Sequence, residues 1–137
     1  MNQIREINQG QLVQLLTTES PDILTLDFLS TRTQSPQVKE MWQVLVASRR
    51  QHYDWLKSFY TTISGKGATV DQVTFSRPAT YQEGIVEQIN EYHQRLRRLM
   101  NLLNEANSDF EQQYLRTLIY YFEREGYILN QIQQLER

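Results

Sequence analysis

Apolar residues recur at intervals of three and four positions along most of the chain. Such intervals place apolar side chains on one face of an α-helix, because the helix turns once in about 3.6 residues. The pattern predicts three long amphipathic helices, over residues 36–63, 81–106 and 110–136. It is interrupted over residues 64–79, where we expect a loop.

Capping signals mark where these helices begin. Ser35 followed by Pro36 is typical of an N-cap and a first helical residue. Thr80–Glu83 and Ser108–Glu111 both have the form of a capping box. Gly126 interrupts the last pattern, and the sequence leaves open whether it kinks the helix or stops it before a short terminal helix.

The first 34 residues predict a shorter helical segment. Their apolar spacing indicates one short amphipathic helix, and Ser20-Pro21 is a cap signal for another short helix ending near Leu29. The apolar positions of the first helix are Ile4, Ile7, Leu12, Leu15 and Leu16. We therefore expect an all-α fold, a single-domain bundle over residues 1–137 with three long helices and a short N-terminal segment. The short turn near Asn107 predicts that the last two long helices form an antiparallel hairpin.

Two charged residues fall inside the apolar stripes. On a helical wheel Trp42, Leu45, Tyr53 and Leu56 all fall within roughly 60° of Val38, and Arg49 lies in the middle of that arc. Glu125 lies in the stripe of the last helix, between Phe122 and Leu129. Because an unpaired buried charge is costly, we hypothesise that Arg49 and Glu125 form an ion pair, within one chain or across a dimer. The alternative is that the stripes end early and both residues are solvated.

Catalytic patterns are not apparent in the sequence. The chain of 137 residues has no cysteine and two histidines, and Glu91 and His93 are not spaced for a shared metal site. The segment from Ser64 to Gly67 lacks the spacing of a phosphate-binding loop. We expect a protein that is not an enzyme, with no cofactor and no metal.

Charge argues against binding nucleic acid through bulk positive potential, because 14 Lys and Arg residues face 16 Asp and Glu residues. Local basic clusters are still candidates for contact with a nucleic-acid backbone. These candidates are Arg49, Arg50, Lys57, Lys66, Arg95, Arg97 and Arg98. The alternative is a solvated, partly paired helix face, with Glu91 placed four residues before Arg95 to form an ion pair.

Aromatic residues lie at the margins of two apolar stripes. Trp55, Tyr120, Tyr121 and Tyr127 do not all fit the inward faces of their helices. Tyr and Trp at such margins are enriched in protein interfaces, so we expect them to form an interface. The alternative is that they cover the N-terminal segment and the loop.

In length and helical layout, the chain from about residue 36 onward resembles the small helical subunits of CRISPR interference complexes. The resemblance maps onto the long helix with Arg49, Arg50 and Lys57 and onto the helix with Arg95, Arg97 and Arg98. It rests on no specific motif. It implies a non-catalytic subunit of an antiviral nucleoprotein complex that contacts RNA or single-stranded DNA.

Two function hypotheses follow from these patterns. The first is a non-enzymatic subunit of a larger assembly, with other protein subunits and nucleic acid as partners. The second is a homo-oligomeric regulatory or scaffolding bundle. The first residues lack a secretory signal pattern and no apolar run is long enough for a membrane span, so we expect a cytoplasmic protein with no membrane partner.

Overall fold

The computed structural model describes residues 9–137, so the predicted apolar positions Ile4 and Ile7 lie outside the described residues. All regular secondary structure in the described part is helical, which confirms the all-α prediction. The ends of the three long helices agree with the predicted ends to within one residue. The helices are α1 (Gln9–Leu16), α2 (Glu19–Ser30), α3 (Pro36–Ser64), α4 (Tyr81–Glu105) and α5 (Asp109–Leu135).

Side-chain caps begin each long helix where the sequence predicts them. The Ser35 hydroxyl accepts a hydrogen bond from the Val38 amide at 3.2 Å and begins α3. The Thr80 and Ser108 hydroxyls accept equivalent bonds, both at 3.1 Å, and begin α4 and α5. Gly65 ends α3 in the left-handed region, with φ of 77°, where a residue without Cβ is favoured.

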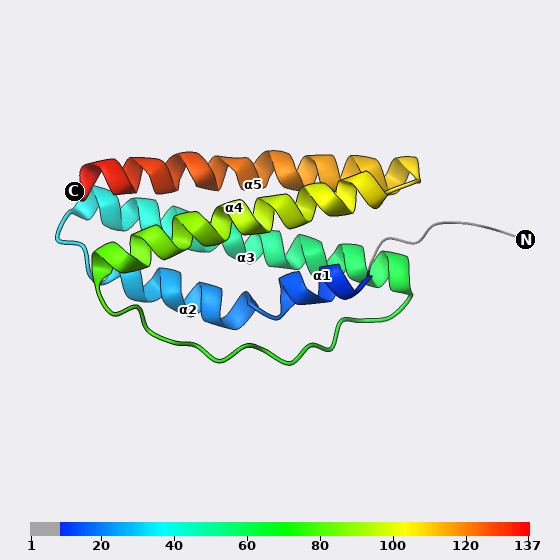
Figure 1. Cartoon of the computed structure of the whole chain (residues 1–137), viewed down its shortest axis with the longest axis horizontal. Helices are drawn as coiled ribbons and strands as arrows, with labels where there is room; N and C mark the ends of the chain where they lie inside the picture. Colours follow the sequence, from blue (N-terminus) through cyan, green and yellow to red (C-terminus); the bar gives the residue numbers. More distant parts are fainter. Residues whose placement is uncertain (1–8) are drawn as a thin grey trace, which may run out of the picture.

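The helices form a bundle with four corners, because α1 and α2 lie end to end and occupy one corner together (Figure 1). Both short helices pack on α3 and α4, and α5 packs on α3 and α4 from the opposite corner. The predicted α4–α5 hairpin is confirmed, with α5 returning antiparallel along α4 (Figure 1).

The predicted second short helix, ending near Leu29, is present as α2, but the prediction that Ser20 is its N-cap is wrong. Helix α2 begins at Glu19, and Thr18 at its N-cap position makes no side-chain cap bond. The hydrogen-bond ladder of α2 already starts at Thr18, whose carbonyl accepts a bond from the Asp22 amide at 2.9 Å. Ser20 therefore lies inside the first turn of α2 and does not precede it.

The segment between α3 and α4 runs back along α1 and α2 as a loop (Figure 1). The Val73 amide donates to the Thr17 carbonyl at 2.9 Å. The Gln72 side chain accepts from the Ser20 amide at 2.8 Å and donates to the Leu16 carbonyl at 3.0 Å. The loop thus supplies partners for backbone groups that the break between α1 and α2 leaves outside a helix.

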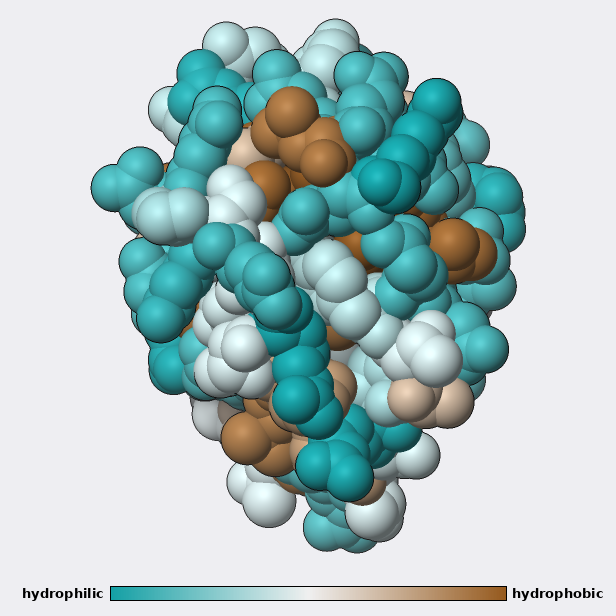
Figure 2. Space-filling view, turned by 90° about the vertical axis from the view of Figure 1, so that its left-hand side faces the viewer, coloured by the Kyte–Doolittle hydropathy of each residue, from teal (hydrophilic) through white to brown (hydrophobic). Residues whose placement is uncertain are grey.

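The core draws apolar side chains from all five helices, and its largest members include Trp42, Tyr53, Phe59 and Phe122. Figure 2 shows the end of the bundle near the C-terminus, where hydrophobic residues surface only as separate patches among hydrophilic ones. Within residues 9–137, no helix combines the length and the apolar character needed to cross a membrane.

Helix α5 runs unbroken through Gly126, so the predicted single helix over residues 110–136 is confirmed and the alternative of a stop at this glycine is wrong. Gly126 is needed instead for the close approach of α4. A Cβ built at this position would lie 2.5 Å from Cζ of Tyr92, far inside van der Waals contact.

We predict that Gly126→Ala destabilises the fold by about 1–3 kcal/mol, since the Tyr92 ring has to move inside a packed core. Gly67→Ala is the matched control, because a Cβ there meets nothing within 4 Å; it should change stability little. Urea unfolding measures both. A Gly126→Ala variant more stable than the wild type, as is usual for Gly→Ala inside a helix, would contradict the close-approach explanation.

Candidate functional site

Arg49 of α3 and Glu125 of α5 form an ion pair inside one chain. Nε and Nη2 of Arg49 each lie 2.8 Å from Oε1 of Glu125. The hydroxyl of Ser48 donates to the other carboxylate oxygen at 2.9 Å. The side chains of the pair are 2% and 1% exposed. The pairing hypothesis is confirmed, and the alternative that both residues are solvated is wrong.

Asp22 of α2 is the centre of a wider network that the sequence reasoning missed. Its Oδ2 lies 3.1 Å from Nη1 of Arg49 and 3.6 Å from Nη1 of Arg95. The hydroxyl of Tyr53 donates to the same oxygen. Asp22 lies seven residues before Leu29, on the buried face of α2. Because α2 is short and weakly amphipathic, its sequence shows no clear apolar stripe in which Asp22 would stand out.

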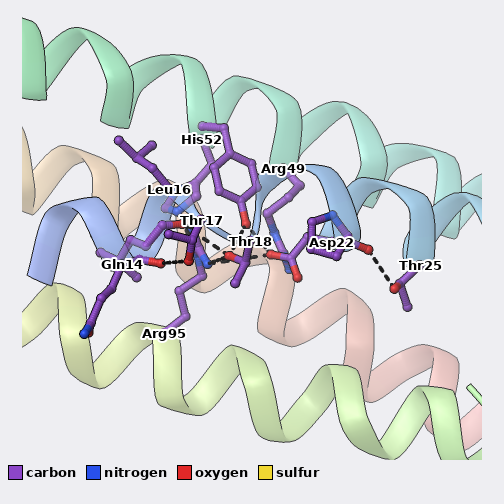
Figure 3. A network of polar contacts seen from close by, with 12 residues as sticks. Gln14, Leu16, Thr17, Thr18, Asp22, Thr25, Arg49, His52 and Arg95 are labelled. Atoms are coloured by element: carbon purple, nitrogen blue, oxygen red, sulfur yellow. Dashed lines mark hydrogen bonds and ion pairs between the residues drawn. The ribbon is translucent and has the colours of Figure 1, made fainter. Parts of the chain in front are cut away.

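Arg95 of α4 binds at the break between α1 and α2 (Figure 3). Its Nη2 donates to the Leu15 carbonyl at 2.7 Å, and its Nη1 donates to the Thr18 hydroxyl at 2.9 Å. Its Nε donates to Nε2 of His52 at 3.1 Å. One guanidinium thus connects α4 with α3 and with both halves of the broken helix.

The predicted solvated position of Arg95, and its ion pair with Glu91, are wrong. The buried face of α4 is a stripe in which Arg95 follows Tyr92 by three residues and precedes Leu99 by four. Arg95 is therefore buried between two core residues, and only 7% of it is exposed. Glu91 is exposed on α4.

The charges of the network balance, since two guanidinium groups face two carboxylates around a neutral histidine. Burial lowers the pKa of Arg49, but the neighbouring Glu125 and Asp22 outweigh this effect and raise it overall. Burial, followed by the positive charges of Arg95 and Arg49, lowers the pKa of His52 well below 6.5. Since Nε2 of His52 accepts a bond, the neutral ring carries its proton on Nδ1.

The candidate nucleic-acid contacts fall into three groups. Arg49 and Arg95 are buried in the network, so their predicted contact with a nucleic-acid backbone is wrong. Arg50 and Lys57 lie at the surface, where Arg50 is 3.9 Å from Asp27 and Lys57 is 3.0 Å from Glu19.

The remaining three basic candidates are exposed. Lys66 lies in the turn that follows α3. Arg97 and Arg98 line a shallow concavity on α4 together with Gln94 and Asn101. Neither arginine forms an ion pair with any residue between 9 and 137. The linear cluster read from the sequence therefore divides into one buried structural arginine and two exposed ones.

An aromatic groove lies between α3 and α5. Its first part, of about 320 Å³, is lined by Trp55, Phe110, Tyr114 and Leu118, with Gln113 and Thr117. Its second part, of about 260 Å³, continues past Trp55 and Leu118 toward Val44, Tyr121, Arg124 and Ile128 and reaches Ser48, His52 and Glu125. The groove thus opens directly onto one edge of the charge network.

The predicted interface residues lie in or beside this groove. Trp55 and Tyr121 both line it, with ring centroids 5.3 Å apart in an edge-on contact. Tyr120 and Tyr127 lie on the solvent face of α5 and are 58% and 74% exposed. Because α5 packs on α3 and α4, these tyrosines do not cover the loop or residues 9–34 of the N-terminal segment, so that alternative is wrong for the described part of the chain.

No family model, curated protein or solved structure matches this chain. Between residues 9 and 137, no group of three or more His, Asp or Glu side chains is arranged to hold a metal ion. The carboxylates and the histidine of the network are instead occupied by arginine and hydroxyl groups. The candidate binding surfaces are therefore the groove between α3 and α5 and the exposed arginines of α4.

We predict that Arg49→Met destabilises the fold by about 3–5 kcal/mol, because it leaves Glu125 buried without its cation. Arg49→Met combined with Glu125→Leu should recover part of this loss, since Asp22 keeps Arg95 and Tyr53 as partners. Urea unfolding of the two single variants and the double variant gives the coupling energy, which we expect at about 1–3 kcal/mol. Strictly additive losses would show that the two side chains do not depend on each other.

We predict that stability falls as the pH drops below about 6.5, the ordinary pKa of histidine. The unfolded chain binds a proton at His52 there and the folded chain does not, so the slope approaches about 1.4 kcal/mol per pH unit. His52→Gln should reduce this slope, measured by urea unfolding between pH 7 and pH 5. His93→Gln, on the exposed face of α4, is the control and should leave the slope unchanged. Equal slopes in the wild type and His52→Gln would refute the assignment.

Proposed function

We propose that this chain is a non-enzymatic helical subunit of a larger assembly, and that it binds another protein through the groove between α3 and α5. The observation that supports this function is the composition of the groove. Trp, Tyr and Arg are the residues that contribute most binding energy in protein interfaces. Here Trp55, Tyr121 and Arg124 line one groove.

The buried network supports the same function by fixing the walls of the groove. Arg49 comes from α3 and Glu125 from α5, and their ion pair lies directly beneath the second part of the groove. A preformed groove spares a partner the cost of ordering the surface that it binds. Since all the charges of the network are paired inside the chain, its proposed role is structural.

A second candidate function is contact with a nucleic-acid backbone within a CRISPR-like nucleoprotein complex. The supporting observation is the concavity on α4, where Arg97 and Arg98 are exposed beside Gln94 and Asn101. Guanidinium and amide groups are suited to binding phosphate oxygens. Binding here would involve two arginines in place of the seven basic residues of the sequence-based proposal.

Site-specific photo-crosslinking in native cells tests the protein-binding function. We expect a photoreactive residue at Gln113 or Gln51, on opposite walls of the groove, to crosslink to the same protein. The matched control position is Asn90, which is exposed on α4. Tyr121→Arg should reduce the crosslinking from Gln113 by about tenfold, the effect of losing an interface aromatic worth over 1 kcal/mol.

Equal crosslinking from the groove and from Asn90 would contradict a specific groove partner. Single-stranded RNA tests the second candidate in parallel. Binding that weakens steeply with salt and is lost in Arg97→Ala/Arg98→Ala would favour nucleic acid as the ligand.

A further inference from the structure

The groove between α3 and α5 exposes a single type of charge. Arg124 is the one exposed charged residue among the side chains that line it, because Glu125 is fully buried and bonded to Arg49. The Arg124 guanidinium lies 5.1 Å and 5.0 Å from the ring centroids of Tyr120 and Tyr121, and it bonds the Tyr120 hydroxyl at 3.2 Å. Arg124 forms no ion pair with any residue between 9 and 137. The rim of the groove therefore presents a guanidinium group that two tyrosines hold in place and that no carboxylate of the described chain pairs with.

The groove also has the dimensions of a helix site. Its lining on α5 extends from Phe110 to Ile128, which corresponds to about 27 Å at 1.5 Å per residue. A partner helix of about 18 residues has the same length. The walls of the second part are the antiparallel helices α3 and α5 (Figure 1), and in the first part α3 contributes Trp55. An amphipathic helix binds such a groove with its apolar face.

We propose that the occupant of the groove is an amphipathic helix of another protein, with its apolar face on Trp55 and Leu118 and an Asp or Glu residue opposite Arg124. This proposal rests on the protein-binding function proposed above and adds the chemistry of the partner. The apolar residues account for affinity and the carboxylate selects the register, because a charge pair at an interface rim contributes more to specificity than to affinity.

The other faces of a second copy of the chain offer no continuous apolar ridge to this groove. Outside the groove and the neighbouring face of α5, the exposed large apolar residues of the described chain are scattered. They are Leu24 on α2, Val73 in the loop, Val86 and Met100 on α4, and Leu135 at the end of α5. The two on α4 are four helical turns apart, so neither α2 nor α4 offers a continuous apolar ridge to a neighbouring copy.

A peptide selection on the full chain tests the proposal. The probe is a library of 18-residue helical peptides with a fixed leucine stripe, in which the positions flanking the stripe vary among Glu, Gln and Lys. We expect the wild-type chain to enrich peptides with Glu at one flanking position and to bind them about fivefold more tightly than the Lys versions. Arg124→Glu should reverse this preference. Arg116→Glu is the matched control, because it makes the same change at an exposed site of α5 that does not line the groove.

Several outcomes would overturn the proposal. Peptides enriched equally by the wild type and by Arg124→Glu would show that the carboxylate is not recognised. A failure to enrich any helical peptide, with crosslinking from Gln113 intact, would overturn the helical occupant and leave the protein-binding function standing.

Other results would identify a different occupant. A two-chain mass in sedimentation that Arg124→Glu abolishes would identify a second copy of the chain. Displacement of the bound peptides by single-stranded RNA would identify nucleic acid. If the wild-type chain neither enriches a peptide nor crosslinks from Gln113, the protein-binding function itself is refuted.

Discussion

Arg49 is the side chain on which the arrangement of this bundle depends. Its guanidinium is almost entirely buried, and it bonds Asp22 from α2 on one side and Glu125 from α5 on the other. A buried guanidinium without these partners would cost several kcal/mol, so α2, α3 and α5 can pack only in the register that brings them together. Such a network contributes little net stability compared with an apolar core of the same shape. We therefore interpret it as a device that excludes other helix registers, a role in which buried polar groups are well attested.

The break between α1 and α2 explains why a second buried arginine is present. A continuous helix would satisfy its own carbonyls, whereas a break in the middle of a packed corner leaves several without intrahelical partners. Arg95 bonds the Leu15 carbonyl from inside the bundle, and Gln72 bonds the Leu16 carbonyl from the loop. The break and the two side chains are thus one structural feature, although its parts lie on three segments far apart in the sequence.

The sequence predicted those features that are determined by neighbouring residues. Helix boundaries and caps depend on residues within one turn, so Ser35, Thr80 and Ser108 were identified correctly. The Arg49–Glu125 pair was also predictable, because each residue stands alone in a clear apolar stripe. Arg95 was misassigned because Arg97 and Arg98 lie beside it in the sequence and suggested an exposed basic cluster.

Other parts of the site depend on packing between distant segments, which one sequence does not specify. Asp22 was missed because α2 is short and weakly amphipathic, so its buried charge did not interrupt an obvious stripe. Gly126 was read as a possible helix stop because only the position of Tyr92 on the neighbouring helix reveals why a residue without Cβ is needed there. The groove could not be predicted either, since its two walls belong to helices joined through α4. Two of its aromatic residues, Trp55 and Tyr121, were however already predicted as interface residues.

The balance of charge inside the bundle has a consequence for its surface. Because Arg49, Arg95, Asp22 and Glu125 neutralise one another in the interior, the helix faces above them need no compensating charges. The groove can therefore remain uncharged along its length except at Arg124, even though it lies against the network. The floor of the groove is fixed, because α3 and α5 cannot move apart or slide past each other without breaking the Arg49–Glu125 ion pair. The same interaction that fixes the helix register thus also fixes the relative position of the two helices that line the groove.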